Sequence, residues 1–470
     1  MILRVAAINR AAFEWIQHEK VGREDGLNNA QLYIVRDEGT PLPPAPGILT
    51  QLQISALMFA DASTRNVNVG DQIINALKKD LEVLARQQNA ENIEERTEDL
   101  LAEAVLVVAA YNMVSRFLIA VDVAGLSDEP IPWPIERKEH LVSLPNSHTI
   151  HAITITASPD APWIVLANSL LTNLHMWEFV IPHFISDSPD TITGKPRKPF
   201  NILIHSQRGH GKSTLPVPPA DTTIPSLASD ISHLLSILNI PTPVHGIVGV
   251  SQGGAASLAF ARSYPELTRS VVACDTSPRT APGNKEAWAG RIGVVYGGVS
   301  AEEILREGIQ GGEVGKGADY ALKVGMGKLA DITVPRWFPK PSKCAEKESE
   351  RGERHKWLAE MVENTPVHGF VAGAGALSDY DLYQSDEECR NLLTSPIERV
   401  LLLVGRLDGG GNIGQGLQHL RDEWNAVRCQ NVNAKPVEYV EIPSAGHLPM
   451  IDEAEHFAEI LRNFLDSFRL

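Results

Sequence analysis

A single serine stands between glycines where an apolar run gives way to a run of small residues. The stretch HGIVGVSQGGAASLAF (245–260) contains the pattern G-V-S-Q-G centred on Ser251. Glycine two positions before and after a serine leaves room for a sharp strand-to-helix turn that presents the hydroxyl at the edge of a sheet. A plain glycine turn that happens to carry a serine is the alternative. The strand-like run before it and the helical run after it favour a nucleophile, so we predict that Ser251 attacks a carbonyl group.

An acid and a base that could serve this serine follow it in the chain. A serine hydroxyl becomes a strong nucleophile when a histidine takes its proton, and that histidine is oriented by an acid. Asp408 follows the apolar run VLLLVG, and His447 follows the strand-like run VEYVEIP. Taken alone, the first could be a solvated turn residue and the second a loop histidine. Serine, acid and histidine occur here in the order that is typical when a serine turn follows a strand of a parallel α/β sheet. We therefore predict a Ser251–Asp408–His447 triad.

Acyl transfer also needs hydrogen-bond donors for the negative oxygen of the tetrahedral intermediate. The backbone N–H of Gln252, directly after the serine, is expected to be one donor. The other is expected in the loop after the run WIVLANS, and from its place in the chain we predict Leu170.

The sequence predicts neither a cofactor nor a metal ion. Residues 206–213 (SQRGHGKS) approach a phosphate-binding loop, but serine replaces its first glycine and three prolines stand where its helix must begin. We therefore interpret the segment as a turn lining the pocket. The cysteines form no CxxC pair and no metal-ligand spacing, a usage typical of a reducing compartment such as the cytoplasm: Cys274, Cys344, Cys389 and Cys429.

The chain divides into two parts with different periodicities. Residues 1–126 repeat apolar positions every three or four residues and predict an all-α domain. A segment rich in proline and charge, 127–140, is expected to be a linker. In 141–470 short apolar runs alternate with helical stretches, which predicts a mostly parallel, doubly wound α/β sheet. The expected strands are HTIHAITIT, WIVLANS, NILIHS, HGIVGVS, RSVVACD, ERVLLLVG and VEYVEIP.

One excursion interrupts this alternation between the fifth and sixth expected strands. Residues of about 284–388 look helical, and such an insertion lies outside the carboxyl ends of the strands, where ligands bind. We interpret it as a lid. Arg291 and Arg336 could supply a cation for an anionic substrate, with Trp288 and Trp337 as an apolar wall; solvated charges and packing tryptophans are the alternative.

Charge and hydropathy limit the partners of this chain. A net charge of −16 over 470 residues argues against nucleic acid and an anionic membrane surface, which would both repel it. The most apolar long run begins at Leu100 and is interrupted by Glu103, Asn112 and Arg116. We interpret it as a buried helix and not as a membrane span. A small molecule is the expected ligand.

From about residue 150 onward the chain resembles the α/β-hydrolases, specifically the 3-oxoadipate enol-lactonases. The resemblance includes LANSLLTNLHMWE, QRGHGKS, CDTSPRTAPGNKEAWAGRI, MGKLADITVPRWF and ENTPVHGFVAGAGALSDYDL. It implies that Ser251, Asp408 and His447 are nucleophile, acid and base, and that the substrate is an enol-lactone from aromatic-ring breakdown.

The first part resembles the all-helical carboxymuconolactone decarboxylase-like family, through FEWIQHEKVGREDGL, LQISALMFADAST and VLVVAAYNMVSRF. This part contains no cysteine, which excludes the peroxide reduction that some members perform with a CxxC pair. Glu14 and His18 are four residues apart and could form an acid–base pair on one helical face, although a structural pair is the alternative. The resemblance also implies a homo-oligomer assembled through this domain.

Together these features predict a serine hydrolase of a lactone or ester. Hydrolysis of an ester or lactone in specialised, polyketide-type metabolism, with the helical domain serving only for assembly, is a competing prediction. A receptor that uses the serine pocket for binding alone is a third, and a complete triad argues against it.

Overall fold

The computed structural model describes residues 1–145, 147–185, 188–189, 196–216, 222–297, 316–346, 348–349, 351–382, 397–428 and 435–468, with side chains of the helix that begins at residue 316 described from 323. It separates into two compact units. One comprises Met1–Glu136 with Pro182–Lys198, and the other comprises Arg137–Ile181 with Pro199–Leu470. Cys389 and Cys429 lie outside the described residues.

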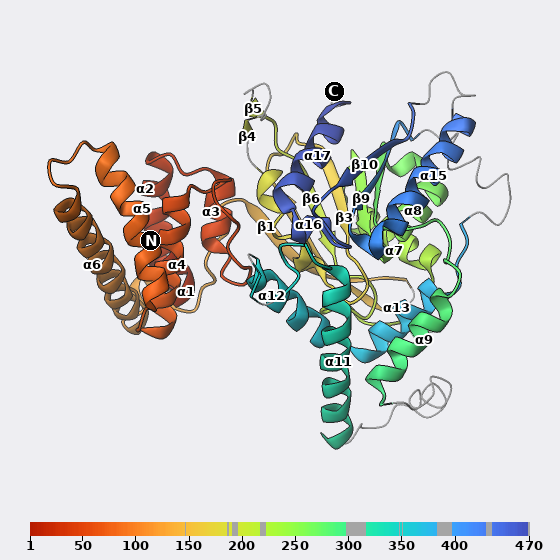
Figure 1. Cartoon of the computed structure of the whole chain (residues 1–470), viewed down its shortest axis with the longest axis horizontal. Helices are drawn as coiled ribbons and strands as arrows, with labels where there is room; N and C mark the ends of the chain where they lie inside the picture. The colour runs from red at the N-terminus through yellow and green to blue at the C-terminus, as the bar shows by residue number, and fades with distance from the viewer. Residues whose placement is uncertain are drawn as a thin grey trace. The chain divides into compact units, whose positions relative to one another are not determined.

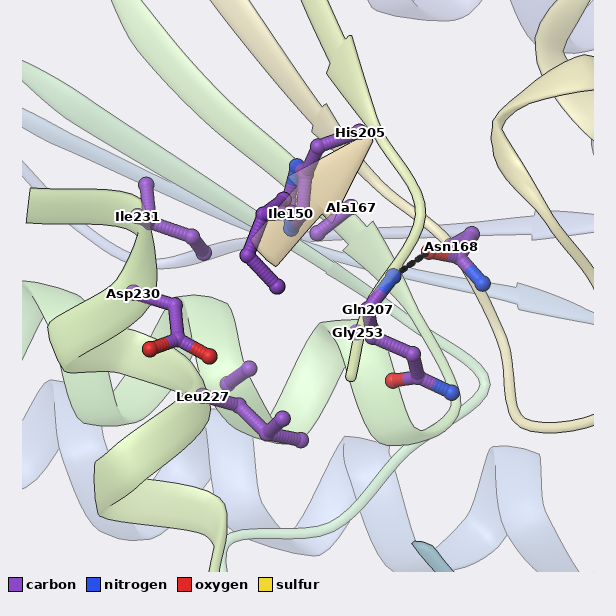
Figure 2. A pocket seen from close by; sticks show the side chains of 10 residues that line it. Ile150, Ala167, Asn168, His205, Gln207, Leu227, Asp230, Ile231 and Gly253 are labelled. Atoms are coloured by element: carbon purple, nitrogen blue, oxygen red, sulfur yellow. Dashed lines mark hydrogen bonds between the residues drawn. The ribbon is translucent and has the colours of Figure 1, made fainter. Parts of the chain in front are cut away.

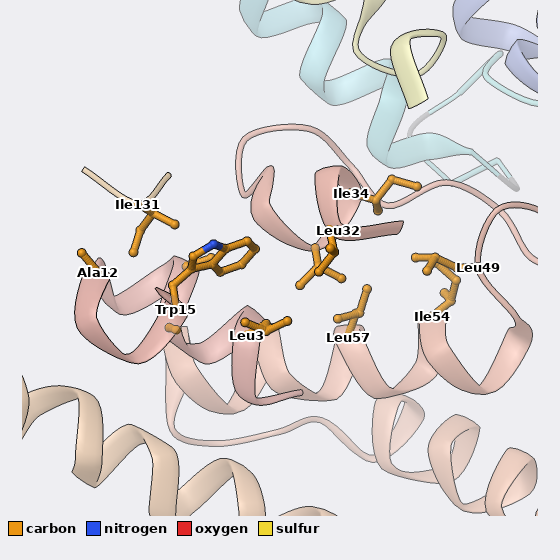
Figure 3. Packing of buried hydrophobic residues seen from close by; sticks show 12 residues of the cluster. Leu3, Ala12, Trp15, Leu32, Ile34, Leu49, Ile54, Leu57 and Ile131 are labelled. Carbon is orange, nitrogen blue, oxygen red and sulfur yellow. The ribbon is translucent and has the colours of Figure 1, made fainter. Parts of the chain in front are cut away.

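The first unit is built from six helices in its first 120 residues (Figure 1). Two of them begin with capping boxes, at Asn28 and Thr50, in which the cap side chain and the glutamine three residues later each bond the other's backbone N–H. The helices are α1 (Ile2–Asn9), α2 (Ala12–Glu24), α3 (Asn29–Arg36), α4 (Gln51–Asn66), α5 (Asp71–Gln87) and α6 (Ile93–Ala120). Figure 3 shows one of their cores, where Trp15, Leu32 and Leu57 face a shared interior.

Much of the apolar surface of helix α6 is exposed, so the prediction of a buried helix is wrong. Leu106, Met113 and Phe117 are 61–67% exposed. The buried positions are the apolar Leu100 and Val108 and the polar Thr97, Asn112 and Ser115. By length and composition alone the helix could cross a bilayer, and 22% of its most apolar 18-residue stretch is buried inside the protein. Composition alone could not assign these residues to a face, because the inner face carries polar groups with partners of their own.

The second unit contains an eight-stranded sheet in the order β1-β2-β6-β3-β7-β8-β9-β10. From β6 to β10 the neighbouring strands are parallel, and β2 is antiparallel to β6. The strands are β1 (Glu136–Ser143), β2 (Thr149–Thr156), β3 (Trp163–Ala167), β6 (Asn201–His205), β7 (Gly246–Val250), β8 (Ser270–Cys274), β9 (Arg399–Gly405) and β10 (Glu438–Ile442); β4 (Ser188–Pro189) and β5 (Pro196–Arg197) form a separate pair. All seven expected runs are strands of this sheet.

Strand β1 occupies residues that the sequence indicated as the end of a linker. Only Val142 is buried among its eight residues, and the strand has a single neighbour, β2, at the edge of the sheet. An exposed edge strand needs no apolar alternation, which is why a charged stretch such as ERKEH gave no strand signal.

Helices pack on this sheet and continue beyond its carboxyl edge. Helix α8 (Gln252–Ser263) contacts α7 (Ile224–Ile237) and strands β3, β7 and β8, while α15 (Asn412–Arg428) contacts β9 and β10. Between β8 and β9 lie α9 (Asn284–Val295), α11 (Lys316–Trp337), α12 (Gly352–Glu363) and α13 (Val367–Ser378), and the chain ends in α16 (Pro449–Asp452) and α17 (Ala454–Asp466). Residues 298–315, 347, 350 and 383–388 of the expected lid lie outside the described residues.

Candidate active site

Ser251 occupies a strained turn between β7 and α8. Its φ and ψ are 54° and −117°, a conformation that residues with a Cβ rarely adopt. The turn is held by the bond from the Ser251 amide to the Cys274 carbonyl, 2.9 Å long. A Cβ on Gly249 would lie 2.1 Å from the Gly253 carbonyl oxygen, and one on Gly253 would lie 2.3 Å from the Ala167 oxygen. The two glycines are therefore required by close backbone contacts, as the pattern predicted.

The side chains of His447 and Asp408 are hydrogen-bonded. The imidazole Nδ1 lies 2.8 Å from Asp408 Oδ2, and both side chains are largely buried. With Asp408 ionised, Nδ1 carries the proton and donates it to the carboxylate, which leaves Nε2 as an acceptor. The pair therefore has the tautomer that a general base needs.

The strand order brings the serine and this pair to the same edge of the sheet. Strands β7, β8, β9 and β10 are successive parallel neighbours. Ser251 follows β7 directly, Asp408 begins the short 3-10 helix η6 (Asp408–Gly411) after β9, and His447 lies five residues beyond the end of β10. Carboxyl ends of parallel strands share an edge, which is where α/β proteins bind their ligands.

A second carboxyl, that of Asp275, lies beside the His447–Asp408 pair, and the sequence reasoning did not identify it. One ligand atom of each of these three residues lies within 4.8 Å of the others. Two carboxyls and an imidazole could bind a cation, but the direct 2.8 Å bond between His447 and Asp408 fits an acid–base pair. The sequence did contain a signal for Asp275: it is an acidic residue directly after β8, and β8 is the neighbour of β7, the strand that leads to Ser251.

The charges around Asp408 favour its ionised form. Burial by itself would raise the pKa of this carboxyl. The charge and hydrogen bond of His447, the positive charge of Arg336 and a hydrogen bond from Asp275 outweigh burial, so the pKa of Asp408 lies below its usual value. The carboxylate can thus stabilise a positive imidazole.

The side chains of Leu170 and Gln252, the two residues expected to supply oxyanion donors, both lie against Gly373 of α13. A Cβ added to Gly373 of α13 would be 2.4 Å from Leu170 Cδ1 and 3.1 Å from Gln252 Oε1. The Gln252 side chain is fixed by a 2.6 Å bond from Nε2 to the Gly373 carbonyl. In the described part of the chain the backbone N–H groups of Leu170 and Gln252 have no protein acceptor. Both are available to a substrate oxygen.

His210 supports the loop that carries Leu170, and this role was also missed. Its Nδ1–H donates to the Arg208 carbonyl (2.9 Å), so Nε2 accepts from the amide of Leu171 at 3.3 Å. Leu171 has a φ of 66°, which a leucine rarely adopts. Burial lowers the pKa of His210 to about 4, so the ring stays neutral and keeps its acceptor nitrogen. The predicted turn RGHG thus supports the oxyanion loop.

Comparisons with known proteins bear on the fold. A family model described as the alpha/beta hydrolase fold matches residues 162–294. "3-Oxoadipate enol-lactonase 2" of Acinetobacter baylyi is 31% identical over 136 residues, which are 29% of this chain and 44% of that protein. "3-Oxoadipate enol-lactonase 1" of the same organism is 22% identical over 321 residues, or 68% and 94% of the two chains. The enol-lactonase of Burkholderia xenovorans has a similar structure, with a TM-score of 0.51 and 24% identity over 70% of this chain and 100% of its own.

The chain has an α/β-hydrolase fold. Over part of its length it resembles the enol-lactonases. The first of these matches spans less than half of its relative's length.

Within this hydrolase fold, Trp337 at the end of α11 contacts His447 in two ways. The Trp337 carbonyl accepts the backbone N–H of His447 at 2.8 Å. The indole also stacks on the imidazole, with ring centroids 6.1 Å apart and planes 20° from parallel. The predicted wall residue is thus in direct contact with the histidine.

The two predicted arginines lie near each other. Among the described residues, no carboxylate lies within ion-pair distance of Arg291 or Arg336. Burial, and then the charge of Arg336, lowers the pKa of Arg291 to about 10. The Arg291 guanidinium lies 4.5 Å from the ring centroid of Trp288. Desolvation by the side chains around its guanidinium lowers the pKa of Arg336, and the negative charge of Asp408 opposes that shift.

A small cavity behind the oxyanion loop is not the substrate site. It is lined by residues that include Ile150, His205, Asp230 and Gly253, and Figure 2 shows the Gln207 amide bonded to Asn168 at its side. Its volume of about 10 Å³ is that of one water molecule. An ester substrate does not fit there.

In the helical unit, Glu14 and His18 both contact α6, but through different residues. Ser115 Oγ donates to Glu14 Oε2 at 2.8 Å, whereas the His18 ring lies edge-on to Tyr111 with centroids 4.9 Å apart. Burial raises the pKa of Glu14 to about 7, against the opposing bond from Ser115, and burial lowers the pKa of His18. Glu14 is therefore bonded to Ser115 and not to His18.

Proposed function

We propose that this chain is a serine hydrolase that cleaves a lactone or ester through Ser251, His447 and Asp408. The observation that supports the proposal most strongly is the His447–Asp408 hydrogen bond, at the sheet edge where Ser251 occupies its strained turn. A structural histidine–aspartate pair would not need a strained serine with two obligatory glycines two strands away.

In the proposed reaction the Ser251 hydroxyl attacks the substrate carbonyl while His447 Nε2 takes its proton. Asp408 stabilises the resulting imidazolium, and the amides of Leu170 and Gln252 bind the oxyanion. The tetrahedral intermediate collapses when His447 gives its proton to the leaving oxygen. Water, deprotonated by the same histidine, then attacks the acyl-enzyme and releases a carboxylic acid and the free serine. In a lactone, the released hydroxyl or enol stays joined to the acyl group.

We propose further that the substrate carries a carboxylate in addition to its reacting carbonyl. Arg291 and Arg336 lie near each other, and no carboxylate of the described residues forms an ion pair with either, so a substrate carboxylate would give these guanidinium groups a direct partner. The relatives named as 3-oxoadipate enol-lactonases make an anionic enol-lactone of aromatic catabolism the first candidate. The helices α9 to α13 would form a lid over it, and a cytoplasmic protein without cofactor or metal suits this chemistry.

For the helical unit we propose a carboxymuconolactone decarboxylase-like domain. Burial raises the pKa of Glu14 to about 7, so Glu14 would be the acid–base group of that domain if the domain is active. The second candidate is a helical domain that serves only for assembly beside a hydrolase of specialised metabolism. The exposed apolar side of α6 favours this candidate, since exposed apolar surfaces mark contacts between proteins.

The nucleophile is tested by labelling with a fluorophosphonate probe and by turnover of 4-nitrophenyl acetate and an enol-lactone. The variant Ser251→Ala should lose the adduct and several orders of magnitude in turnover. Ser232→Ala is the matched control, because Ser232 is a helical serine of α7 bonded to its own helix at the Ser229 carbonyl. Labelling or wild-type turnover in the Ser251 variant would reject the proposal.

A further inference from the structure

Asp275 lies beside the catalytic pair, and the mechanism above gives it no role. It is the first residue after β8, it is 3% exposed, and its φ of 45° lies in the left-handed region. Its amide donates to the Leu403 carbonyl at 3.0 Å, and its Oδ1 accepts from the Gly405 amide at 2.9 Å. These bonds to β9 fix the Asp275 carboxyl against the segment that leads to Asp408.

The two neighbouring carboxyls differ in the partners that stabilise a negative charge. Asp408 has His447 at 2.8 Å and the positive charge of Arg336. Asp275 has the amide of Gly405, and no N–H or O–H group of the described residues reaches its Oδ2. Besides Asp408, the imidazole of His447 and the buried thiol of Cys274 also lie near Asp275. Two adjacent buried carboxyls do not both ionise, so the proton belongs on the one with fewer partners.

We propose that Asp275 is a positioning residue that, as a neutral acid, donates a hydrogen bond to the Asp408 carboxylate and holds it on His447 Nδ1. Its kinetic consequence depends on the function proposed above. Burial, and then the negative charge of Asp408, raises the pKa of Asp275 well above its usual value, in agreement with the geometry. The proton stays on Asp275 while His447 accepts and releases the proton of the reaction.

Two substitutions separate a neutral Asp275 from a charged one. Asp275→Asn keeps an acceptor for Gly405 and a donor for Asp408, and asparagine tolerates a positive φ. It should retain kcat/KM within about threefold and leave the acid limb of the pH profile in place. Asp275→Ala removes the donor, so the carboxylate of Asp408 becomes more basic; we expect about a tenfold or greater loss and an acid limb at higher pH.

The opposite shift would overturn the proposal. If Asp275 were an anion, Asp275→Asn would remove negative charge near the imidazole, and the acid limb would move to lower pH. An unchanged rate and profile in Asp275→Ala would also overturn the positioning role. Thermal melting of each variant shows whether a loss of rate follows from unfolding, and Asp275→Asn decides the question if Asp275→Ala does not fold.

Infrared spectroscopy gives a readout that does not depend on turnover. At neutral pH, the difference spectrum between the native chain and Asp275→Asn should contain the carbonyl band of a protonated carboxylic acid. A carboxylate band in its place would overturn the proposal. If instead the band is present but Ser251→Ala keeps its activity, the proposed hydrolase mechanism fails while the protonation of Asp275 stands.

Discussion

Trp337 holds His447 through both its backbone and its ring, with a 2.8 Å bond from the histidine amide to its carbonyl and a stacked indole against the imidazole. Trp337 ends α11, directly after Arg336. The residue that positions the proposed base is therefore the chain neighbour of a proposed substrate-binding cation.

The stacking contact predicts the effect of removing the indole. Trp337→Ala keeps the backbone carbonyl but leaves the imidazole without its stacking partner. We expect kcat for 4-nitrophenyl acetate to fall about 3- to 10-fold, the equivalent of an aromatic pair, whereas Trp337→Phe should recover most of it. Steady-state kinetics of both variants provide the measurement. Equal losses in the two variants would show that ring stacking is not what positions His447.

The proposed role of Arg291 and Arg336 predicts a selective loss of affinity. Arg291→Ala or Arg336→Ala should raise KM for an anionic lactone about 10- to 100-fold, because a charge-assisted hydrogen bond to the substrate is lost. KM for neutral 4-nitrophenyl acetate should stay within about threefold in both variants. Comparing the two substrates in one preparation controls for damage to the fold. A similar rise for both substrates would contradict a role in carboxylate recognition.

The two carboxyls predict a non-additive pair of substitutions. In Asp408→Asn the negative neighbour of Asp275 is gone, which lets Asp275 ionise and partly replace it beside His447. We expect a loss in kcat of about 100-fold, smaller than the loss of about 10⁴ known for removing the acid of such a triad. Asp408→Asn with Asp275→Asn should approach that larger loss. If the double variant is no slower than the single one, Asp275 does not substitute for Asp408.

Glu14 predicts a pH dependence of stability. Its pKa is raised from 4.5 to about 7 in the folded chain, so the folded state binds more protons between these values. Its contribution to stability is complete below pH 4.5, declines as the pH rises through 7, and then levels off; the decline is about 3 kcal/mol.

The matched variant is Glu14→Gln, which keeps an acceptor for Ser115 Oγ and cannot ionise. Its free energy of unfolding in urea, followed by circular dichroism of the full chain, should exceed that of the native chain more at pH 8 than at pH 5. An equal difference at both pH values would mean that Glu14 titrates near its unfolded value.

The sequence predicted those parts of the site that depend on chain order and backbone shape. Gly249 and Gly253 have no room for a side chain, so the turn around Ser251 was visible as a pattern. Asp408 and His447 followed from their places after apolar strands. Strand β1 was not predictable, because an exposed edge strand lacks apolar alternation. Asp275 was not predictable either, because its proposed role depends on which of two neighbouring carboxyls holds a proton. The outward side of α6 depends on polar partners such as Ser115 for Glu14, which lie far away in sequence.

The carbonyl of Trp337 limits how this chain could be remodelled. Exchanging the helical insertion for one from another protein of this fold would also remove the Trp337 carbonyl that bonds the His447 amide. A Cβ on Gly446 would meet that same carbonyl at 2.0 Å, so the loop and the insertion fit only as a matched set. Grafted insertions should therefore retain the last turn of α11 from the host chain.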